Sequence, residues 1–384
     1  MRPATSYCLS GVATAVPACL PGGPAAAQGH RDEGLGQTIG GWMVAFPVIP
    51  RSFIMLVLLA AGGATVAEPT VTYGRRAPVT TLPPVPAVTS SDASLADPRG
   101  DAGPDIGHVT ACLHRSPFLV NMKLPEGSRV STNTPGVVGF SVLVPDPKAG
   151  RIRPLVHGTW KAAGHLGQFT YDRQGNIYVV PVPLTSLEVN PLEAQNKVHI
   201  LDAQTGRMRE FIDLPAPRPI ATSNPFGTIG LAYDCDTNSL YVASLAGSSA
   251  SEELGTIFRV DLNSNQIAAR IDGIDALGLG LFKGSSGKRL YFGLGRVPEV
   301  RSIAVDQNGD FEGESRRELS LADLGLPRNY RAQKIRFKAG AIMRLKALPF
   351  AYSLRVIGPE DIEYRSLRYL PGDRWEPIDS KNKT

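Results

Sequence analysis

The sequence predicts an all-β protein, and three observations lead to this prediction. A pattern of strand, polar turn, strand, loop, strand, polar turn and strand occurs twice between Gly167 and Asp272. Glycine (40 residues) and proline (32 residues) are abundant, as in chains with many turns. After residue 105, a helical period appears only in a short stretch at Leu319–Leu324. Four antiparallel strands per repeat, with an aspartate closing each hairpin, are typical of a β-propeller blade.

The two central repeats differ in sequence but share their order of elements. The first contains GQFTYDRQGNIYVV and KVHILDAQTGRMREFIDL, and the second contains IGLAYDCDTNSLYVAS and GTIFRVDLNSNQIAARID. The tracts Ile177–Val180 and Leu240–Ala243 are apolar on both faces. Strands with this pattern are expected to be covered on both sides, as they are between neighbouring blades.

Weaker copies of the pattern extend over residues 106–378. Two copies follow the central pair. Upstream, GFSVLVPDPKAGRIRPLVHG matches the second hairpin of a repeat, and we expect the first hairpin of that repeat in HVTACLHRSPFLVNMKL. The expected turn acids of the second hairpins are Asp146, Asp202, Asp261, Asp306 and, approximately, Glu360. Their irregular spacing excludes a solenoid, which needs a near-constant pitch. We predict a six-bladed β-propeller of four-stranded antiparallel blades, with five or seven blades as alternatives.

The residues before the propeller divide into three segments. We expect residues 1–42 to be disordered, or to lie upstream of the true start if translation begins at Met43 or Met55. Residues 43–67 resemble a secretory signal peptide, with Arg51, an apolar core and a small-residue exit that predicts cleavage after Ala67 or Ala64. A short membrane anchor is the alternative. Residues 68–105 are a Pro/Ser/Thr-rich linker, and residues 379–384 are a tail. The prediction is a secreted or periplasmic protein with no stable membrane span after cleavage.

Charge and cysteine content narrow the classes of partner. The formal net charge is +5, and the basic residues occur singly along the predicted strands, so we expect no nucleic-acid partner. The four cysteines form no CxxC motif, which disfavours a zinc site. Cys112 and Cys235 are the cysteines that remain after signal removal, and they either form a disulfide or stay as two free thiols. We expect a monomer.

One segment resembles a known repeat family. The stretch NPFGTIGLAYDCDTNSLYVAS (Asn224 to Ser244) resembles the NHL-repeat consensus, and HLGQFTYDRQGNIYVV (His165 to Val180) resembles it more loosely. Similar segments occur in the regucalcin/gluconolactonase-like (TolB-like) and strictosidine-synthase-like six-bladed propellers. The consensus aspartate after YVA is Ser244 here and Pro181 in the other copy. The resemblance implies the fold and leaves the activity open.

In the lactonase-like members, side-chain oxygen atoms at the mouth of the channel hold a divalent cation, usually calcium, which polarises the substrate. This resemblance implies Asn224 and Asp275 as candidate metal ligands, with His165 as a weaker third. No lactonase motif surrounds these residues. Asn224 precedes Pro225, so the alternative is that it opens a turn.

Two functions are consistent with these observations. The first is a binding module that contacts a protein or small-molecule ligand through the loops Pro181 to Asn196 and Leu245 to Gly255. The second is a metal-dependent lactonase or esterase-like hydrolase. No GxSxG, P-loop or dinucleotide motif occurs, so catalytic residues remain unassigned and the binding module is favoured.

Overall fold

The computed structural model describes residues 106–108, 112, 115–146, 148, 150–183, 187–355 and 358–378. All of them belong to a compact unit that comprises Pro78–Thr384. The predicted signal peptide, the linker and the tail lie outside the described residues. No helix in the described part of the chain is long and apolar enough to cross a membrane.

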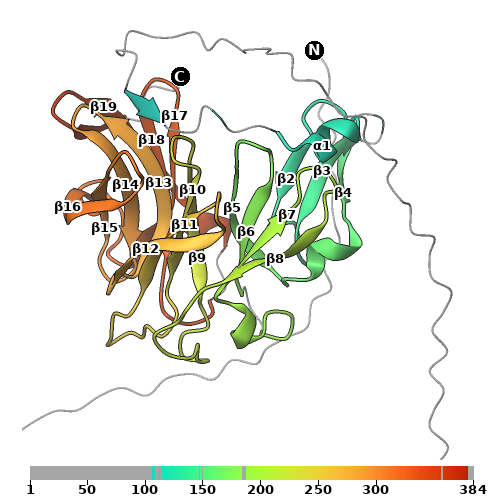
Figure 1. Cartoon of the computed structure of the whole chain (residues 1–384), viewed down its shortest axis with the longest axis horizontal. Helices are drawn as coiled ribbons and strands as arrows, with labels where there is room; N and C mark the ends of the chain where they lie inside the picture. Colours follow the sequence, from blue (N-terminus) through green and yellow to red (C-terminus); the bar gives the residue numbers. More distant parts are fainter. Residues whose placement is uncertain are drawn as a thin grey trace, which may run out of the picture. The chain divides into compact units, whose positions relative to one another are not determined.

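The described residues form five antiparallel sheets that follow one another along the chain (Figure 1), an arrangement consistent with a β-propeller. The first sheet contains β2 (Arg129–Ser131), β3 (Ser141–Asp146) and β4 (Arg151–Leu155). The second contains β5 (Leu166–Tyr171), β6 (Ile177–Pro181), β7 (Lys197–Leu201) and β8 (Met208–Asp213). The third contains β9 (Thr228–Asp234), β10 (Ser239–Ser244), β11 (Thr256–Asp261) and β12 (Gln266–Asp272).

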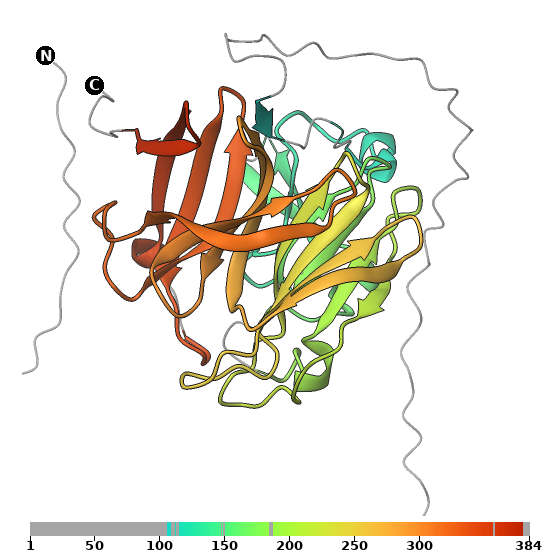
Figure 2. The same ribbon diagram turned by 60° about the vertical axis from the view of Figure 1, so that its left-hand side comes forward.

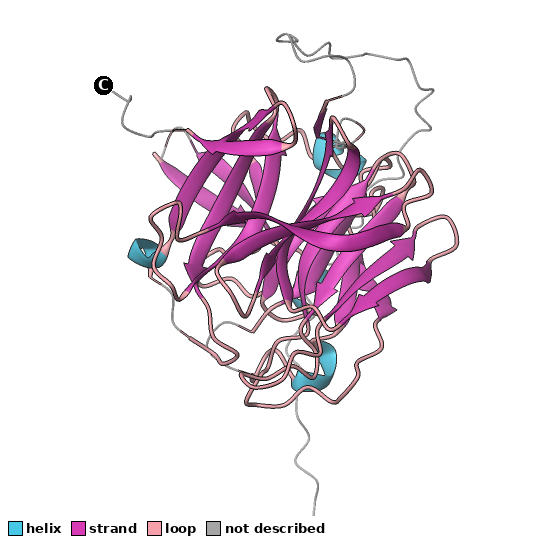
Figure 3. Ribbon diagram, turned by 90° about the vertical axis from the view of Figure 1, so that its left-hand side faces the viewer, coloured by secondary structure: helices cyan, strands magenta, loops and turns pink. Residues whose placement is uncertain are grey.

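The last two sheets complete the domain. The fourth contains β13 (Ala276–Gly284), β14 (Gly287–Leu294), β15 (Glu299–Val305) and β16 (Phe311–Ser320), and β1 (Gly107–His108) adds a fifth strand beside β13. The fifth contains β17 (Tyr330–Lys338), β18 (Ile342–Pro349), β19 (Glu363–Leu370) and β20 (Arg374–Pro377). Strands dominate the domain (Figure 3). The helical elements are α1 (Pro117–Asn121) and three 3₁₀ turns, η1 (Gly158–Lys161), η2 (Leu192–Ala194) and η3 (Pro359–Asp361).

The sheet count corrects the prediction of six blades. The described residues form five sheets, which was one of the two alternatives. The reason lies in the segment before Arg129, where a first hairpin was expected. Pro117 occupies the start of α1, where its fixed φ favours a helical turn, and Phe118 and Leu119 are buried there. The first sheet therefore has three strands among the described residues, and the described part of the segment contributes the short β1 to another sheet.

One hairpin turn was also placed incorrectly. Asp202, Asp261 and Asp306 accept backbone N–H groups within their turns, as predicted. Glu360 instead lies in η3, in the connection between β18 and β19. The proline at position 359 starts this 3₁₀ turn, and the last hairpin follows it, with Asp373 in its turn at a φ of 53°.

Each interface between consecutive sheets contains its own apolar cluster. The four clusters join the first sheet to the second, the second to the third, the third to the fourth and the fourth to the fifth. Val179 and Val242 belong to the two tracts that are apolar on both faces. Both side chains are fully buried, each in a different one of these clusters. Among the described residues, no cluster contains side chains from both the fifth sheet and the first. One face of the fifth sheet is therefore not packed into an apolar cluster of the described residues.

A disulfide joins Cys112 to Cys235, whose Cα atoms are 5.8 Å apart and whose positions differ by 123 residues. Cys235 lies in the turn between β9 and β10, so the bond ties the segment before the first sheet to the third sheet. The structure thus contains the cross-link rather than two free thiols.

Candidate functional site

The innermost strands of four sheets surround a central channel. Short stretches of β5, β9, β13 and β17 line the same cavity inside it. Across the channel, the side-chain amide of Gln168 on β5 donates to the carbonyl oxygen of Gln333 on β17 (2.5 Å). The strands β5, β9 and β17 begin at one end of the channel, and the cavity at that end has a volume of about 310 Å³. We call it the channel-mouth cavity.

Two lysines place positive charge in the channel-mouth cavity. Lys334 on β17 and Lys346 on β18 lie directly opposite each other in the sheet, and both line the cavity together with Arg355. Like charges at opposed positions of adjacent strands repel each other. No carboxylate of the described residues forms an ion pair with either lysine. The Lys334 Nζ atom lies 5.8 Å from the centre of the Phe169 ring, a cation–π contact.

The surroundings of Lys334 lower its proton affinity. Burial disfavours its charged form, and Arg336 and Lys346 add repulsion, so the pKa of Lys334 falls to about 8. Burial also lowers the pKa of Lys346. A negatively charged group bound between the two lysines would relieve both effects.

Much of the remaining cavity wall is apolar and aromatic. Phe226, which precedes β9, and Phe350, which follows β18, lie with ring centres 5.8 Å apart. Leu166, Ile229 and Leu348 extend this wall. The predicted loop Pro181 to Asn196 reaches the site through Val182 and Pro183. The cavity therefore combines cationic side chains with apolar ones, an arrangement typical of small-molecule sites.

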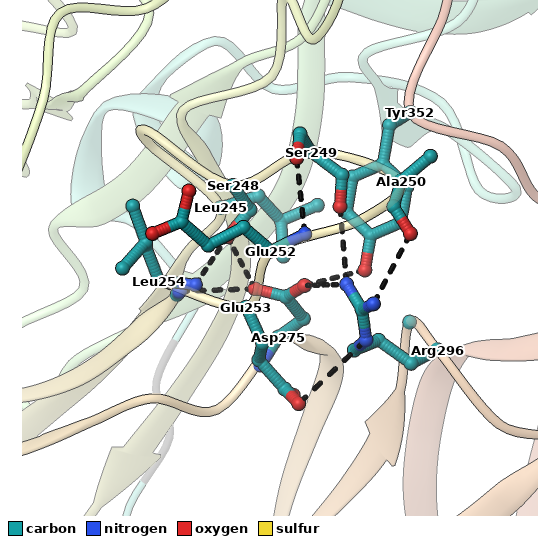
Figure 4. Close-up of polar contacts among 12 residues, drawn as sticks. Leu245, Ser248, Ser249, Ala250, Glu252, Glu253, Leu254, Asp275, Arg296 and Tyr352 are labelled. Atoms are coloured by element: carbon teal, nitrogen blue, oxygen red, sulfur yellow. Dashed lines mark hydrogen bonds and ion pairs between the residues drawn. The ribbon is translucent and has the colours of Figure 1, made fainter.

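Asn224 and Asp275, the two candidate metal ligands, belong to one hydrogen-bonded cluster at the same end of the channel. Figure 4 shows the part of this cluster around Asp275. Ser248 links them, because its carbonyl oxygen accepts from the Asn224 side chain (2.9 Å) and its hydroxyl donates to Asp275 (2.5 Å). Asp275 also accepts from the Gly255 backbone N–H (2.9 Å) and the Tyr352 hydroxyl. Asn224 and Asp275 are almost fully buried, at 2% and 0% exposed.

The cluster holds the second predicted rim loop, Leu245 to Gly255. Arg296 donates to the carbonyl oxygens of Ser249 and Ala250 and lies 3.9 Å from the Asp275 carboxylate. In addition, Arg218 forms a bidentate ion pair with Glu252. We interpret the arrangement as a support for the loop, because the oxygens of Asp275 already accept hydrogen bonds.

Tyr352 connects this cluster to the channel-mouth cavity. Its hydroxyl donates to Asp275, and its ring centre lies 5.2 Å from that of Phe350. Burial and the Asp275 carboxylate raise the pKa of Tyr352, so its hydroxyl keeps the proton that it donates. Asp275 thereby positions an aromatic side chain of the cavity wall through one intermediate residue.

The third metal candidate, His165, lies at the start of β5, where its backbone N–H donates to the Asn190 side chain. The part of the chain that the structure describes contains no group of three or more His, Cys, Asp or Glu residues placed to hold a metal ion. The Asn224 N–H donates to the Ala221 carbonyl oxygen and closes that turn, and its side-chain oxygen accepts from the Phe226 N–H (3.3 Å) and so opens the next turn. This is the turn role that its position before Pro225 indicated.

Sequence reasoning missed Lys334 and Lys346. The sequence does contain a signal for a cationic strand face: basic residues stand at every second position in Lys334–Lys338 and again in Arg344–Lys346. Side chains two apart on a strand lie on one face. Along the sequence these charges stand as single residues, and only the pairing of β17 with β18 shows that they gather.

Comparisons with known proteins give no family. No known family matches the chain, and no curated protein matches its sequence. Among solved structures, a protein of unknown function from Bacteroides caccae is similar at 14% identity and a TM-score of 0.37, over 66% of this chain and 74% of that one. A protein from Lactobacillus plantarum has 13% identity and a TM-score of 0.39, over 67% and 68%. A putative exo-β-1,3-galactanase from Bifidobacterium bifidum has 11% identity and a TM-score of 0.38, over 67% and 89%. We take no function from these similarities.

Proposed function

We propose that this chain is a ligand-binding module that holds a small anionic molecule in the channel-mouth cavity. The observation that carries the proposal is the pair of half-buried lysines, Lys334 and Lys346, which face each other without a carboxylate partner among the described residues. Their mutual repulsion costs free energy in the empty site, and an anion between them would offset that cost.

The apolar part of the cavity wall supports a ligand with an apolar body. Phe226 and Phe350 provide ring surface, and the side-chain amides of Gln168 and Gln333 provide polar atoms nearby. A molecule with a carboxylate or phosphate at one end and an apolar or sugar ring at the other can contact both the lysines and the rings. Such complementarity, rather than cavity size, gives specificity.

Calorimetry with matched small molecules tests the proposal. We would titrate the protein with benzoate, gluconate and glucose 6-phosphate, and with benzamide and glucose as uncharged counterparts. We expect at least one anion to bind and its counterpart to bind far more weakly. Replacing either lysine (Lys334→Met or Lys346→Met) should weaken binding about tenfold or more, since a charge-assisted hydrogen bond contributes about 1.5–3 kcal/mol.

The exposed Lys161, which lies in η1 outside the cavity, gives the control Lys161→Met, for which binding should be unchanged. Equal binding of the charged and uncharged molecules, or equal affinities of all three variants, would contradict the proposal.

We retain secretion or periplasmic export as part of the proposed function. It is supported by the apolar segment before Ala67 and by the Cys112–Cys235 disulfide, since disulfides persist in oxidising compartments. The metal-dependent hydrolase remains the alternative. Elemental analysis of the purified protein separates the two: stoichiometric calcium, zinc or manganese, together with a melting temperature lowered by a chelator, would favour the hydrolase.

A further inference from the structure

One face of the last sheet carries a dense group of positive side chains. Directly opposed residues of paired strands share a face, and the register pairs Lys334 with Lys346, Arg336 with Arg344, and Ile342 with both Lys338 and Arg368. We call this the cationic face. It comprises Lys334, Arg336 and Lys338 of β17, Arg344 and Lys346 of β18, and Arg368 of β19.

Most of the cationic face is accessible, and its charges form no ion pair with the described residues. Arg336, Lys338, Arg344 and Arg368 are exposed. None of the ion pairs within the described residues involves any member of the face, whereas eleven other Lys and Arg residues do form such pairs. Glu376 of β20, which lies opposite Arg368, is the acidic residue next to the face.

The two faces of this sheet differ in kind. Ile335, Met343, Leu345 and Leu367 point the other way and are buried against the fourth sheet. Figure 2 shows the last sheet, drawn in orange to red, at one side of the domain. The cationic face therefore points away from the interface with the fourth sheet, and no apolar cluster of the described residues covers it.

We infer that the cationic face binds an acidic polysaccharide through its four exposed cations, which lie outside the channel-mouth cavity, whereas Lys334 and Lys346 belong to both sites. Alternate residues of a strand are about 6.8 Å apart and neighbouring strands about 4.8 Å apart, so the cations form parallel rows. A flexible chain of carboxylated or sulfated sugars can follow such rows while staying hydrated. Tyr364, 52% exposed and 5.2 Å from the Arg344 guanidinium, offers a ring at which a sugar can stack.

Two other classes of partner fit the face less well. The core of a protein interface is depleted of charged residues, and a folded partner would have to desolvate these cations. Single-stranded nucleic acid is usually held by several aromatic side chains that stack successive bases, and the face offers one exposed tyrosine. An acidic sugar polymer needs neither an apolar core nor a series of stacking rings.

Binding to heparin and polygalacturonate tests the inference. The triple variant K338Q/R344Q/R368Q removes three cations that do not line the channel-mouth cavity. We expect it to elute from immobilised heparin at clearly lower salt, and to bind polygalacturonate at least tenfold more weakly, than the wild type. The control triple K161Q/R270Q/R317Q removes the same charge from other surfaces and should behave as the wild type. Circular dichroism and melting temperature verify that both variants fold.

Three outcomes would overturn the inference. The first is equal loss of binding in both triple variants, which would show attraction to net charge alone. The second is unchanged binding in the face variant. The third is tighter binding of single-stranded DNA than of either polysaccharide, lost in the face variant, which would make the face a nucleic-acid site. Small-anion binding should persist in the face variant, so a failure here leaves the channel-mouth proposal standing.

Discussion

Asp275 is a fully buried carboxylate at the point where the chain enters the fourth sheet. Four groups surround it: the Ser248 hydroxyl, the Gly255 N–H, the Tyr352 hydroxyl and the Arg296 guanidinium. Removing a buried charge leaves its partners unsatisfied. Asp275 therefore serves the site indirectly, because it holds both the rim loop and the aromatic wall.

We predict that Asp275→Ala lowers the free energy of unfolding by about 3 kcal/mol, the usual size of breaking a buried charged network. Urea denaturation measures this change. Asp323, whose side chain is 74% exposed and forms one long ion pair, is the matched control, and Asp323→Ala should cost less than about 0.5 kcal/mol. Similar costs for both variants would show that the cluster around Asp275 contributes little.

The lowered pKa of Lys334 gives stability a defined pH dependence. The unfolded lysine keeps its ordinary pKa of 10.5, while the folded one titrates at about 8. Between these pH values Lys334 is protonated in the unfolded chain and largely neutral in the folded protein, so the free energy of unfolding rises with pH. Below about pH 8 the lysine is charged in both states, and its destabilising effect is constant.

We predict that the stability of the wild type, relative to Lys334→Met, increases as pH rises from 8 to 10.5. Thermal melts of both proteins across this range measure the difference, and Lys161→Met should show no such trend. Anion binding in the cavity should weaken over the same range as Lys334 loses its charge. A flat difference between wild type and Lys334→Met would contradict the assigned pKa.

At the scale of elements, the Cys112–Cys235 disulfide connects two parts that share no sheet. It closes a loop of 123 positions, which restricts the unfolded chain. We predict that reduction, or the double replacement C112A/C235A, lowers the free energy of unfolding by about 2–5 kcal/mol. A reductant should have no effect on the double variant. Detection of two free thiols by mass spectrometry without reductant would contradict the cross-link.

The hairpins show how far local patterns reach. The turn aspartates Asp202, Asp261 and Asp306 were found from sequence, because an aspartate that accepts its own turn's N–H groups needs only nearby residues. The segment around Phe118 was assigned to a hairpin and contains a helical turn. Its apolar side chains fill a space beside Trp160 on a different element, which local periodicity does not record.

At the scale of the whole molecule, each sheet is covered by its sequence neighbours, and the exception is the pair formed by the last and the first. The cationic face lies on the last sheet, and the three-stranded first sheet exposes Ile152 (52%) on β4. The sixth blade predicted from sequence would have stood between these two sheets. The described residues contain no such blade, and both proposed sites lie on or beside the fifth sheet, where the blade would have packed.

The proposed export of the chain leads to a prediction about its mature form. Expression of the full gene in a bacterium with an intact secretion system should yield protein outside the cytoplasm. Its first residue should be Glu68 or Thr65, after cleavage at the small-residue exit. N-terminal sequencing gives the result, and a mature chain that still begins at or before Met43 would contradict the signal-peptide hypothesis.

The sequence by itself determined the strands and turns of the central repeats, because alternation along a strand and side-chain bonding within a turn depend on residues close in the chain. The number of sheets, the cross-link and the gathering of Lys334, Lys346 and Arg344 depended on tertiary structure. Pairing between strands decides which side chains meet, and packing between sheets decides which faces stay open. Neither is a property of any single stretch of the sequence.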